Sequence, residues 1–96
     1  MASTRLTKKE RIAHYVDRIK ETIRSKHPEA QFLLTPGEER ETWDLLTYTN
    51  AADDFEIIDL TVRLVADIDG REPFSIYVIP MPLSVYRGNG QSERAA

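Results

Sequence analysis

TWDLLTYTNAADDFEIIDLTVRLVADIDGREPFSIYVI, residues 42–79, is the stretch that decides the fold. It begins with Thr42–Thr49, where bulky and β-branched side chains alternate between the two faces of a strand. It ends with Pro73–Ile79, which has the same character. The segment between these two runs is long enough and apolar enough to form a helix. The stretch therefore predicts a strand, a helix and a second strand, with Pro80-Met81-Pro82 stopping the ladder.

The central helix is predicted to begin after an N-cap at Asn50 or Asp53 and to end near Asp69, with Gly70 just beyond its last turn. Its apolar residues cover a wide arc, and the helix needs cover on more than one side. We expect one group of them to pack against the sheet. That group is Phe55, Ile58, Val62, Val65 and Ala66, widened sideways by Ile57, Leu64 and Ile68.

Upstream of this unit lie a helix and a third strand. Thr7-Lys8-Lys9-Glu10 matches a capping box, and His27-Pro28 ends the helix, so the helix is predicted over 8–26. Its apolar residues form one helical stripe: Ile12, Tyr15, Val16, Ile19 and Ile23. Residues 30–35 read as a strand that forms an antiparallel hairpin with the strand at 42–49, through a turn in which Gly37 supplies a positive φ.

The element order α-β-β-α-β predicts an α+β two-layer sandwich, with a three-stranded mixed sheet and two helices on one face. The strand order stays open. We expect a disordered N-terminal arm at 1–6, a single domain at 7–83 and a disordered C-terminal tail at 84–96.

Both faces of the predicted sheet carry bulky apolar side chains, whereas a sheet with one open face should alternate apolar and polar residues. Helices can cover only one face, so the other is either an exposed apolar patch or an interface. We expect it to form an interface between two copies of this chain. The candidate interface residues are Leu33, Leu46, Tyr48, Tyr77 and Ile79.

Charge is divided unevenly along the chain. Residues 1–27 carry eight basic and three acidic side chains, while residues 28–96 carry five basic and thirteen acidic ones. We expect the basic helix to dock on the acidic remainder, with its basic side chains bordering the buried stripe. The alternative is a nucleic-acid element. Its candidate contacts are Lys9, Arg11, Arg18 and Lys20.

The order α-β-β-α-β also resembles that of type II KH-like domains, which implies nucleic-acid or ribosome binding as the alternative function. The chain lacks their Gly-x-x-Gly loop, and its second helix is acidic where that class needs positive potential. We therefore expect nucleic acid not to be the main partner.

Little in the sequence indicates catalysis. There is no cysteine, and His14 and His27 are far apart. Asp67-Ile68-Asp69 has metal-binding residue types, but it falls in a helix end with no phosphate-binding Gly-Ser loop before it. We expect no catalytic residues, no metal and no cofactor.

The overall reading is a small non-enzymatic interaction or regulatory module that self-associates through its sheet as a homodimer or binds another protein. No apolar run approaches the roughly 18 residues of a membrane span. With no cysteine, we expect a cytoplasmic protein.

Overall fold

The computed structural model describes residues 6–87. Its elements are α1 (Lys8–Arg24), β1 (Gln31–Pro36), β2 (Thr42–Thr49), α2 (Asp54–Arg71), β3 (Ser75–Pro82) and the short 3₁₀ turn η1 (Leu83–Val85). The predicted α+β order α-β-β-α-β is confirmed. Residues 1–5 of the expected arm and 88–96 of the expected tail lie outside the described residues.

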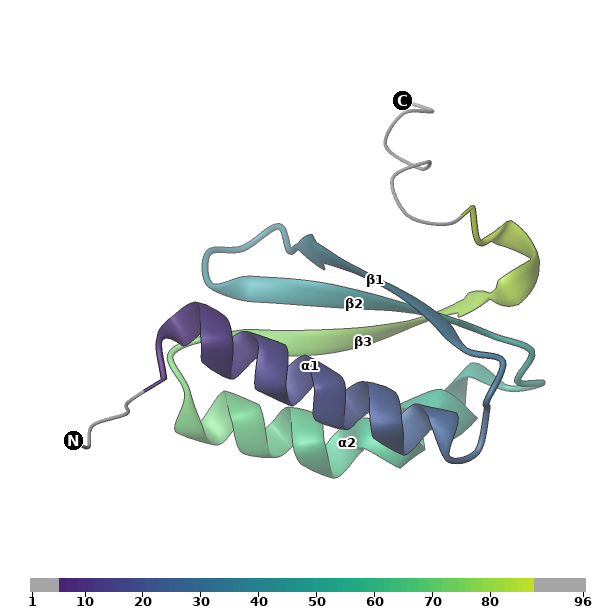
Figure 1. The fold of residues 1–96 in the computed structure, drawn as a ribbon, viewed down its shortest axis with the longest axis horizontal. Coiled ribbons are helices and arrows are strands. Elements are labelled where there is room, and N and C mark those ends of the chain that lie inside the picture. Colours follow the sequence, from purple (N-terminus) through teal and green to yellow (C-terminus); the bar gives the residue numbers. More distant parts are fainter. Residues whose placement is uncertain (1–5, 88–96) are drawn as a thin grey trace.

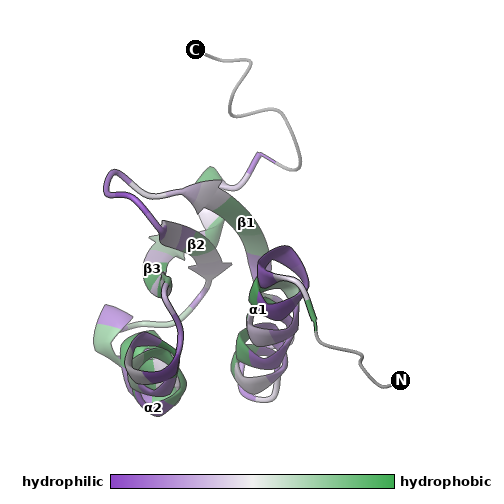
Figure 2. Cartoon of the chain, turned by 90° about the vertical axis from the view of Figure 1, so that its left-hand side faces the viewer, coloured by the Kyte–Doolittle hydropathy of each residue, from purple (hydrophilic) through white to green (hydrophobic). Residues whose placement is uncertain are grey.

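The three strands form one mixed sheet in the order β1-β2-β3. The pair β1 and β2 is antiparallel, as the hairpin requires, and β2 and β3 are parallel. Both helices lie on one face of the sheet (Figure 1). Seen end on, α1 lies beneath β1 and α2 beneath β3 (Figure 2). The structure thus supplies the strand order that the sequence left open: β2 is central, and β1 and β3 are both edges.

The capping box of α1 is present in both halves. The backbone N–H of Glu10 donates to the Thr7 hydroxyl at 3.1 Å, and the N–H of Thr7 donates to the Glu10 carboxylate at 2.9 Å. Four members of the predicted stripe, Ile12, Val16, Ile19 and Ile23, are buried. The helix ends at Arg24, two residues before the predicted end.

The N-terminus of α2 is capped by Asp53, whose carboxylate accepts from the N–H of Phe55 at 2.9 Å. The predicted end at Asp69, with Gly70 beyond the helix, is wrong. The helix continues to Arg71, and Glu72 is the extended residue that ends it. Glu72 precedes Pro73, and the residue before a proline is driven from the helical region, so the proline stops this helix rather than the glycine.

The predicted buried face of α2 is also wrong. Phe55, Ile58 and Val62 are 68%, 38% and 51% exposed. Ile57 and Ile68, which the sequence predicts only to widen the apolar arc, lie instead at the centre of the helix's contact with the core. They are buried there together with Thr61. The polar Thr61 disguised this face in the sequence. Its hydroxyl donates to the carbonyl of Ile57 at 3.2 Å, so its burial leaves no unpaired polar group.

The prediction that Pro80-Met81-Pro82 ends the ladder is wrong, because β3 pairs with β2 through Pro82. The N–H of Ser75 donates toward β2, to the carbonyl of Glu41 at 2.9 Å. Pairing groups alternate along a strand, so Ile79 and Met81 also face β2. Pro80 and Pro82 fall at positions where an N–H would point to the open edge, and their missing donors cost nothing there.

The hairpin turn between β1 and β2 differs from the expected one. The residue with a left-handed backbone is Glu41, with φ of 59°, and not Gly37. Gly37 is needed for close approach instead, because a Cβ there would lie 2.2 Å from the Thr42 hydroxyl oxygen.

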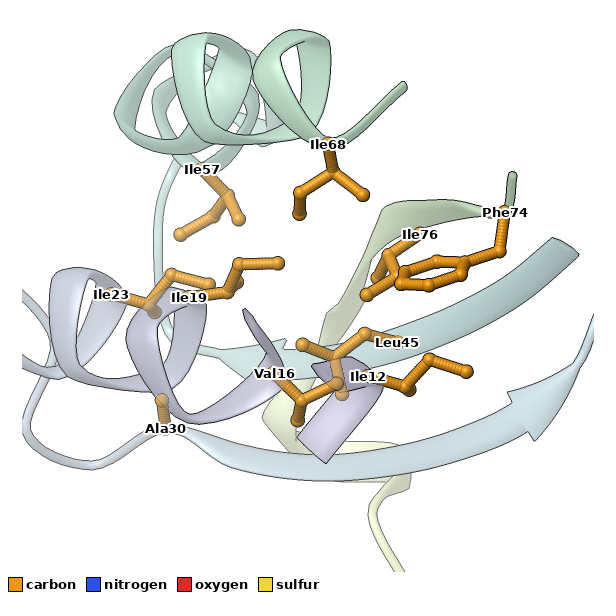
Figure 3. Packing of buried hydrophobic residues seen from close by; sticks show 10 residues of the cluster. All are labelled: Ile12, Val16, Ile19, Ile23, Ala30, Leu45, Ile57, Ile68, Phe74 and Ile76. Atoms are coloured by element: carbon orange, nitrogen blue, oxygen red, sulfur yellow. The ribbon is translucent and has the colours of Figure 1, made fainter. Parts of the chain in front are cut away.

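The core lies between the sheet and both helices (Figure 3). Both helices contribute isoleucines, and β2 and β3 contribute the fully buried Leu45 and Ile76. The cluster comprises Ile12, Val16, Ile19, Ile23, Ala30, Leu45, Ile57, Ile68, Phe74 and Ile76. Within residues 6–87, neither helix has the length and apolarity needed to cross a membrane.

Candidate interaction surface

The five candidate interface residues share the sheet face that points away from the helices. Register aligns Leu33 with Leu46 and Leu46 with Ile79, so these three form one row across the strands. Tyr48 and Tyr77 have the same parity and lie in the rows on either side. The prediction that these residues lie together is confirmed. Their role in an interface stays a prediction.

One end of this outer face is covered by the chain itself. The ring of Tyr86 lies 5.0 Å from that of Tyr48, centroid to centroid, and Tyr48 is only 6% exposed. Residues 84–87, expected to begin the disordered tail, instead form the end of η1 and the segment that carries Tyr86. Tyr48 therefore presents almost no surface to a partner.

The other end of the outer face is polar. Glu38, Glu39, Thr42 and Asp44 line a shallow hollow there together with Tyr77. Between the two ends, Leu33, Leu46 and Ile79 are half-buried. The apolar part of the outer face is thus a short row rather than the broad patch that the sequence suggested.

The larger exposed apolar surface lies at the side of the molecule, where α2 meets the edge strand β3. The exposed residues of α2 continue into a hollow of about 290 Å³ between the helix and the strand. We call this region the α2–β3 surface. It consists of Phe55, Ile58, Val62, Val65, Tyr77, Val78 and Ile79.

Two of the predicted interface residues, Tyr77 and Ile79, line the hollow of the α2–β3 surface, whereas Leu33, Leu46 and Tyr48 do not. The helical part was missed because its apolar residues had been assigned to the core. The available signal was the width of the apolar arc, since a helix on one side of a sheet cannot bury so wide an arc.

The candidate nucleic-acid contacts on α1 divide into two pairs. Arg11 forms an ion pair with Glu72 at 3.0 Å and lies over the Phe74 ring, and Lys20 lies over the Phe32 ring. These contacts confirm that basic side chains border the buried stripe.

The other pair, Lys9 and Arg18, is exposed, and neither side chain has an ion-pair partner among residues 6–87. The predicted contact set is therefore not a single free basic patch.

A polar cluster joins α1 to the end of α2. The Tyr15 hydroxyl donates to the Glu72 carboxylate at 2.7 Å, beside the Arg11 guanidinium. The bond from Tyr15, followed by that from Arg11, lowers the pKa of Glu72, although partial burial opposes this. The same bond, which favours the neutral phenol, raises the pKa of Tyr15. The groups satisfy one another and hold the helices together.

Neither histidine belongs to a group that could hold a metal ion in the part of the chain described. His14 is exposed on α1, and no group of three or more metal-ligating side chains is found within residues 6–87. His27 lies between two carboxylates, with Nε2 at 2.8 Å from Glu56 and Nδ1 at 3.5 Å from Glu29. It joins the loop after α1 to the first turn of α2.

Glu29 is held in place by a backbone bond. Its carboxylate accepts from the N–H of Asn50 at 2.9 Å, and this bond is the main cause of its lowered pKa. The ionised groups around the helix ends thus serve the fold.

Comparison of the chain with known proteins gives no family, curated protein or solved structure that matches it.

Proposed function

We propose that this chain is a small non-enzymatic interaction module that self-associates. The observation that carries the proposal is the α2–β3 surface, where Phe55 is 68% exposed beside a hollow lined by apolar side chains. Contiguous exposed apolar surface is costly in water, and on a folded domain it marks a site of association. The outer face of the sheet, which the sequence predicts as the interface, contributes only Tyr77 and Ile79 of β3 to this surface.

A non-enzymatic role is supported by the use of the polar groups. Displaced pKa values and charge pairs mark functional sites when they gather in a cleft. Here Glu72 and Tyr15 bond each other, and Glu29 bonds the backbone of Asn50. We further propose a cytoplasmic location, which the absence of cysteine supports.

Nucleic-acid binding, the role that the KH-like element order implied, is the second candidate. Lys9 and Arg18 favour it, because they are exposed on one helix. Arg11 and Lys20, which it also needs, are engaged with Glu72 and Phe32. We therefore rank it below self-association.

Sedimentation of the full chain over about a hundredfold range of concentration tests the first candidate, because self-association follows mass action. We expect the mass to rise from monomer toward dimer. A monomer at every concentration would overturn self-association.

Titration with single-stranded RNA at low and moderate salt tests the second candidate. We expect no binding by the parent chain and none by a Lys9→Ala, Arg18→Ala double variant. Tight binding that weakens steeply with salt, and that this variant loses, would instead establish nucleic acid as the partner, since phosphate contacts release counterions.

A further inference from the structure

We infer that the α2–β3 surface binds a second copy of itself, with the two α2 helices packed antiparallel about a two-fold axis at the level of Leu60. This inference rests on the self-association proposed above and specifies its geometry. The shape of the surface, the charges beside it and the state of the β3 edge support it.

The surface carries both a projecting side chain and a hollow. Phe55 projects from the first turn of α2, and the hollow of about 290 Å³ lies farther along the same side of the helix. A cavity of about 150 Å³ already accepts benzene, so the hollow has room for a phenylalanine ring. A surface that carries both parts is complementary to itself under a two-fold rotation.

One antiparallel register satisfies both ends of the surface. It sets Phe55 against Val65 of the second copy, at the side of the hollow, and Ile58 against Val62 of the second copy. The two pairs have the same mean sequence position, so a single axis near Leu60 relates both. At about 1.5 Å per residue, Phe55 and Val65 are about 15 Å apart along the helix, which places both ring-and-hollow contacts within a helix pair of ordinary length.

The charges beside the exposed apolar stripe also fit a second copy. Asp59 and Arg63 border it on the side away from β3, since successive helical residues are about 100° apart. In an antiparallel two-fold pair each border meets the same border of the other helix. Arg63 then lies at the level between Glu56 and Asp59 of the second copy. The pairing forms twice, once for each protomer.

Arg63 and Asp59 are available for such pairs. Neither side chain has an ion-pair partner within residues 6–87, whereas Arg71 and Asp67, farther along the same helix, are paired at 3.0 Å. Asp59 and Arg63 carry opposite charges and lie one helical turn apart. In an antiparallel second copy their order is reversed, so each charge lies near the opposite charge of the other helix. This complementarity favours a second copy of the chain over an unrelated protein.

The edge of β3 argues for side-chain packing rather than strand addition. The positions of β3 whose backbone groups point away from β2 include Pro80 and Pro82, which have no N–H to donate. They also include Ile76, which is fully buried. Prolines and covered positions are the usual protection of an edge strand. The open groups that remain are too few for a ladder, so α2 is the element that makes the contact.

A charge exchange tests this geometry in the full chain. Asp59→Arg alone and Arg63→Asp alone each place like charges across the axis, and we expect each to raise the dimer dissociation constant about tenfold. An equimolar mixture of the two should form a heterodimer close to the parent in affinity, because every crossed pair is again of opposite sign.

The matched control uses Asp67→Arg and Arg71→Asp. These changes have the same chemistry and spacing on the same helix, but they lie beyond the register that pairs Phe55 with Val65. We expect both control variants to dimerise like the parent, with no preference for the mixed species. A mixture of the control variants that favours heterodimers equally would overturn the inference, because net charge alone would then explain the preference.

A second pair of variants tests the projecting ring. Phe55→Ser should raise the dissociation constant at least about tenfold without unfolding the chain, since the ring is exposed. Leu34→Ser, at an exposed apolar residue of β1, should not change it.

The outcomes separate the two proposals. A parent that is monomeric throughout overturns both. A parent dimer that is insensitive to Phe55→Ser and to the charge exchange overturns only the α2 geometry and leaves self-association standing. Substitution of Leu33 and Leu46 by lysine then tests the outer sheet face.

Discussion

Two neighbouring isoleucines on α2 provide a decisive test of how this helix is oriented. Ile57 is fully buried and Ile58 is 38% exposed. Ile57→Ala and Ile58→Ala remove the same atoms from adjacent positions and change helix propensity equally. Any difference in their cost therefore reports burial alone.

The magnitude follows from the burial of each side chain. Three carbons removed from a buried site at about 0.8 kcal/mol each give about 2.4 kcal/mol of lost transfer free energy. A residual cavity adds to this, so Ile57→Ala should lower the free energy of unfolding by about 3–4 kcal/mol. At Ile58 only part of this transfer term is lost, and the hollow already opens to solvent. Ile58→Ala should cost about 1.5 kcal/mol.

Denaturant unfolding followed by far-UV circular dichroism, with Trp43 fluorescence as a second probe, measures both variants against the parent. In thermal unfolding, a loss of about 3 kcal/mol in the free energy of unfolding corresponds to a fall in Tm of about 12–24 °C for a chain of this size. Because Ile58 also lies on the proposed dimer surface, unfolding is compared at several protein concentrations. If Ile58→Ala costs as much as Ile57→Ala at the lowest concentration, the orientation of α2 described above is refuted.

Three further outcomes are expected. Tyr15→Phe removes the main cause of the lowered pKa of Glu72, so the pKa of Glu72 measured by NMR should rise. A carboxyl group whose pKa is lowered by folding stabilises the protein above its unfolded pKa, and this stabilisation is lost as the pH falls. The variant should therefore be less stable than the parent at neutral pH and lose less stability on acidification. Tyr86→Ala should expose Tyr48 and lower the free energy of unfolding by about 1–2 kcal/mol in a urea titration; no loss would show that this contact contributes little. Gly37→Ala should cost about 1–3 kcal/mol in the same titration, because the added methyl group overlaps a hydroxyl across the hairpin, and an unchanged midpoint would show that the turn relaxes freely.

Local chemistry was sufficient for much of the fold. The capping box at Thr7 and Glu10 specifies the start of α1 through contacts three residues apart, and the prediction was correct to the residue. Thr42–Thr49 is bounded as predicted, because turn residues flank a run of bulky and β-branched side chains. The stripe of α1 is narrow, so it has only one face to bury, and that face was also predicted correctly.

The errors lie where a segment had more than one acceptable arrangement. The apolar arc of α2 offers two candidate faces, and helix periodicity does not rank them. The choice was made by the position of α2 beneath the edge strand β3 and beside α1, which buries Ile57 and Thr61 and leaves Phe55 outside. The run Pro80-Met81-Pro82 predicts the end of strand pairing, which holds for a central strand but not for an edge strand.

The sequence by itself therefore determined the element order, the capping box of α1, which residues share each face of a strand and the presence of surplus apolar surface, because each depends on residues close together in the chain. Only the tertiary structure decided where that surplus lies. Strand order sets which edge α2 covers, and the return of Tyr86 covers Tyr48 on the outer face. Both are contacts between residues far apart in sequence, so the exposed apolar surface moved from the sheet to α2 and the edge of β3.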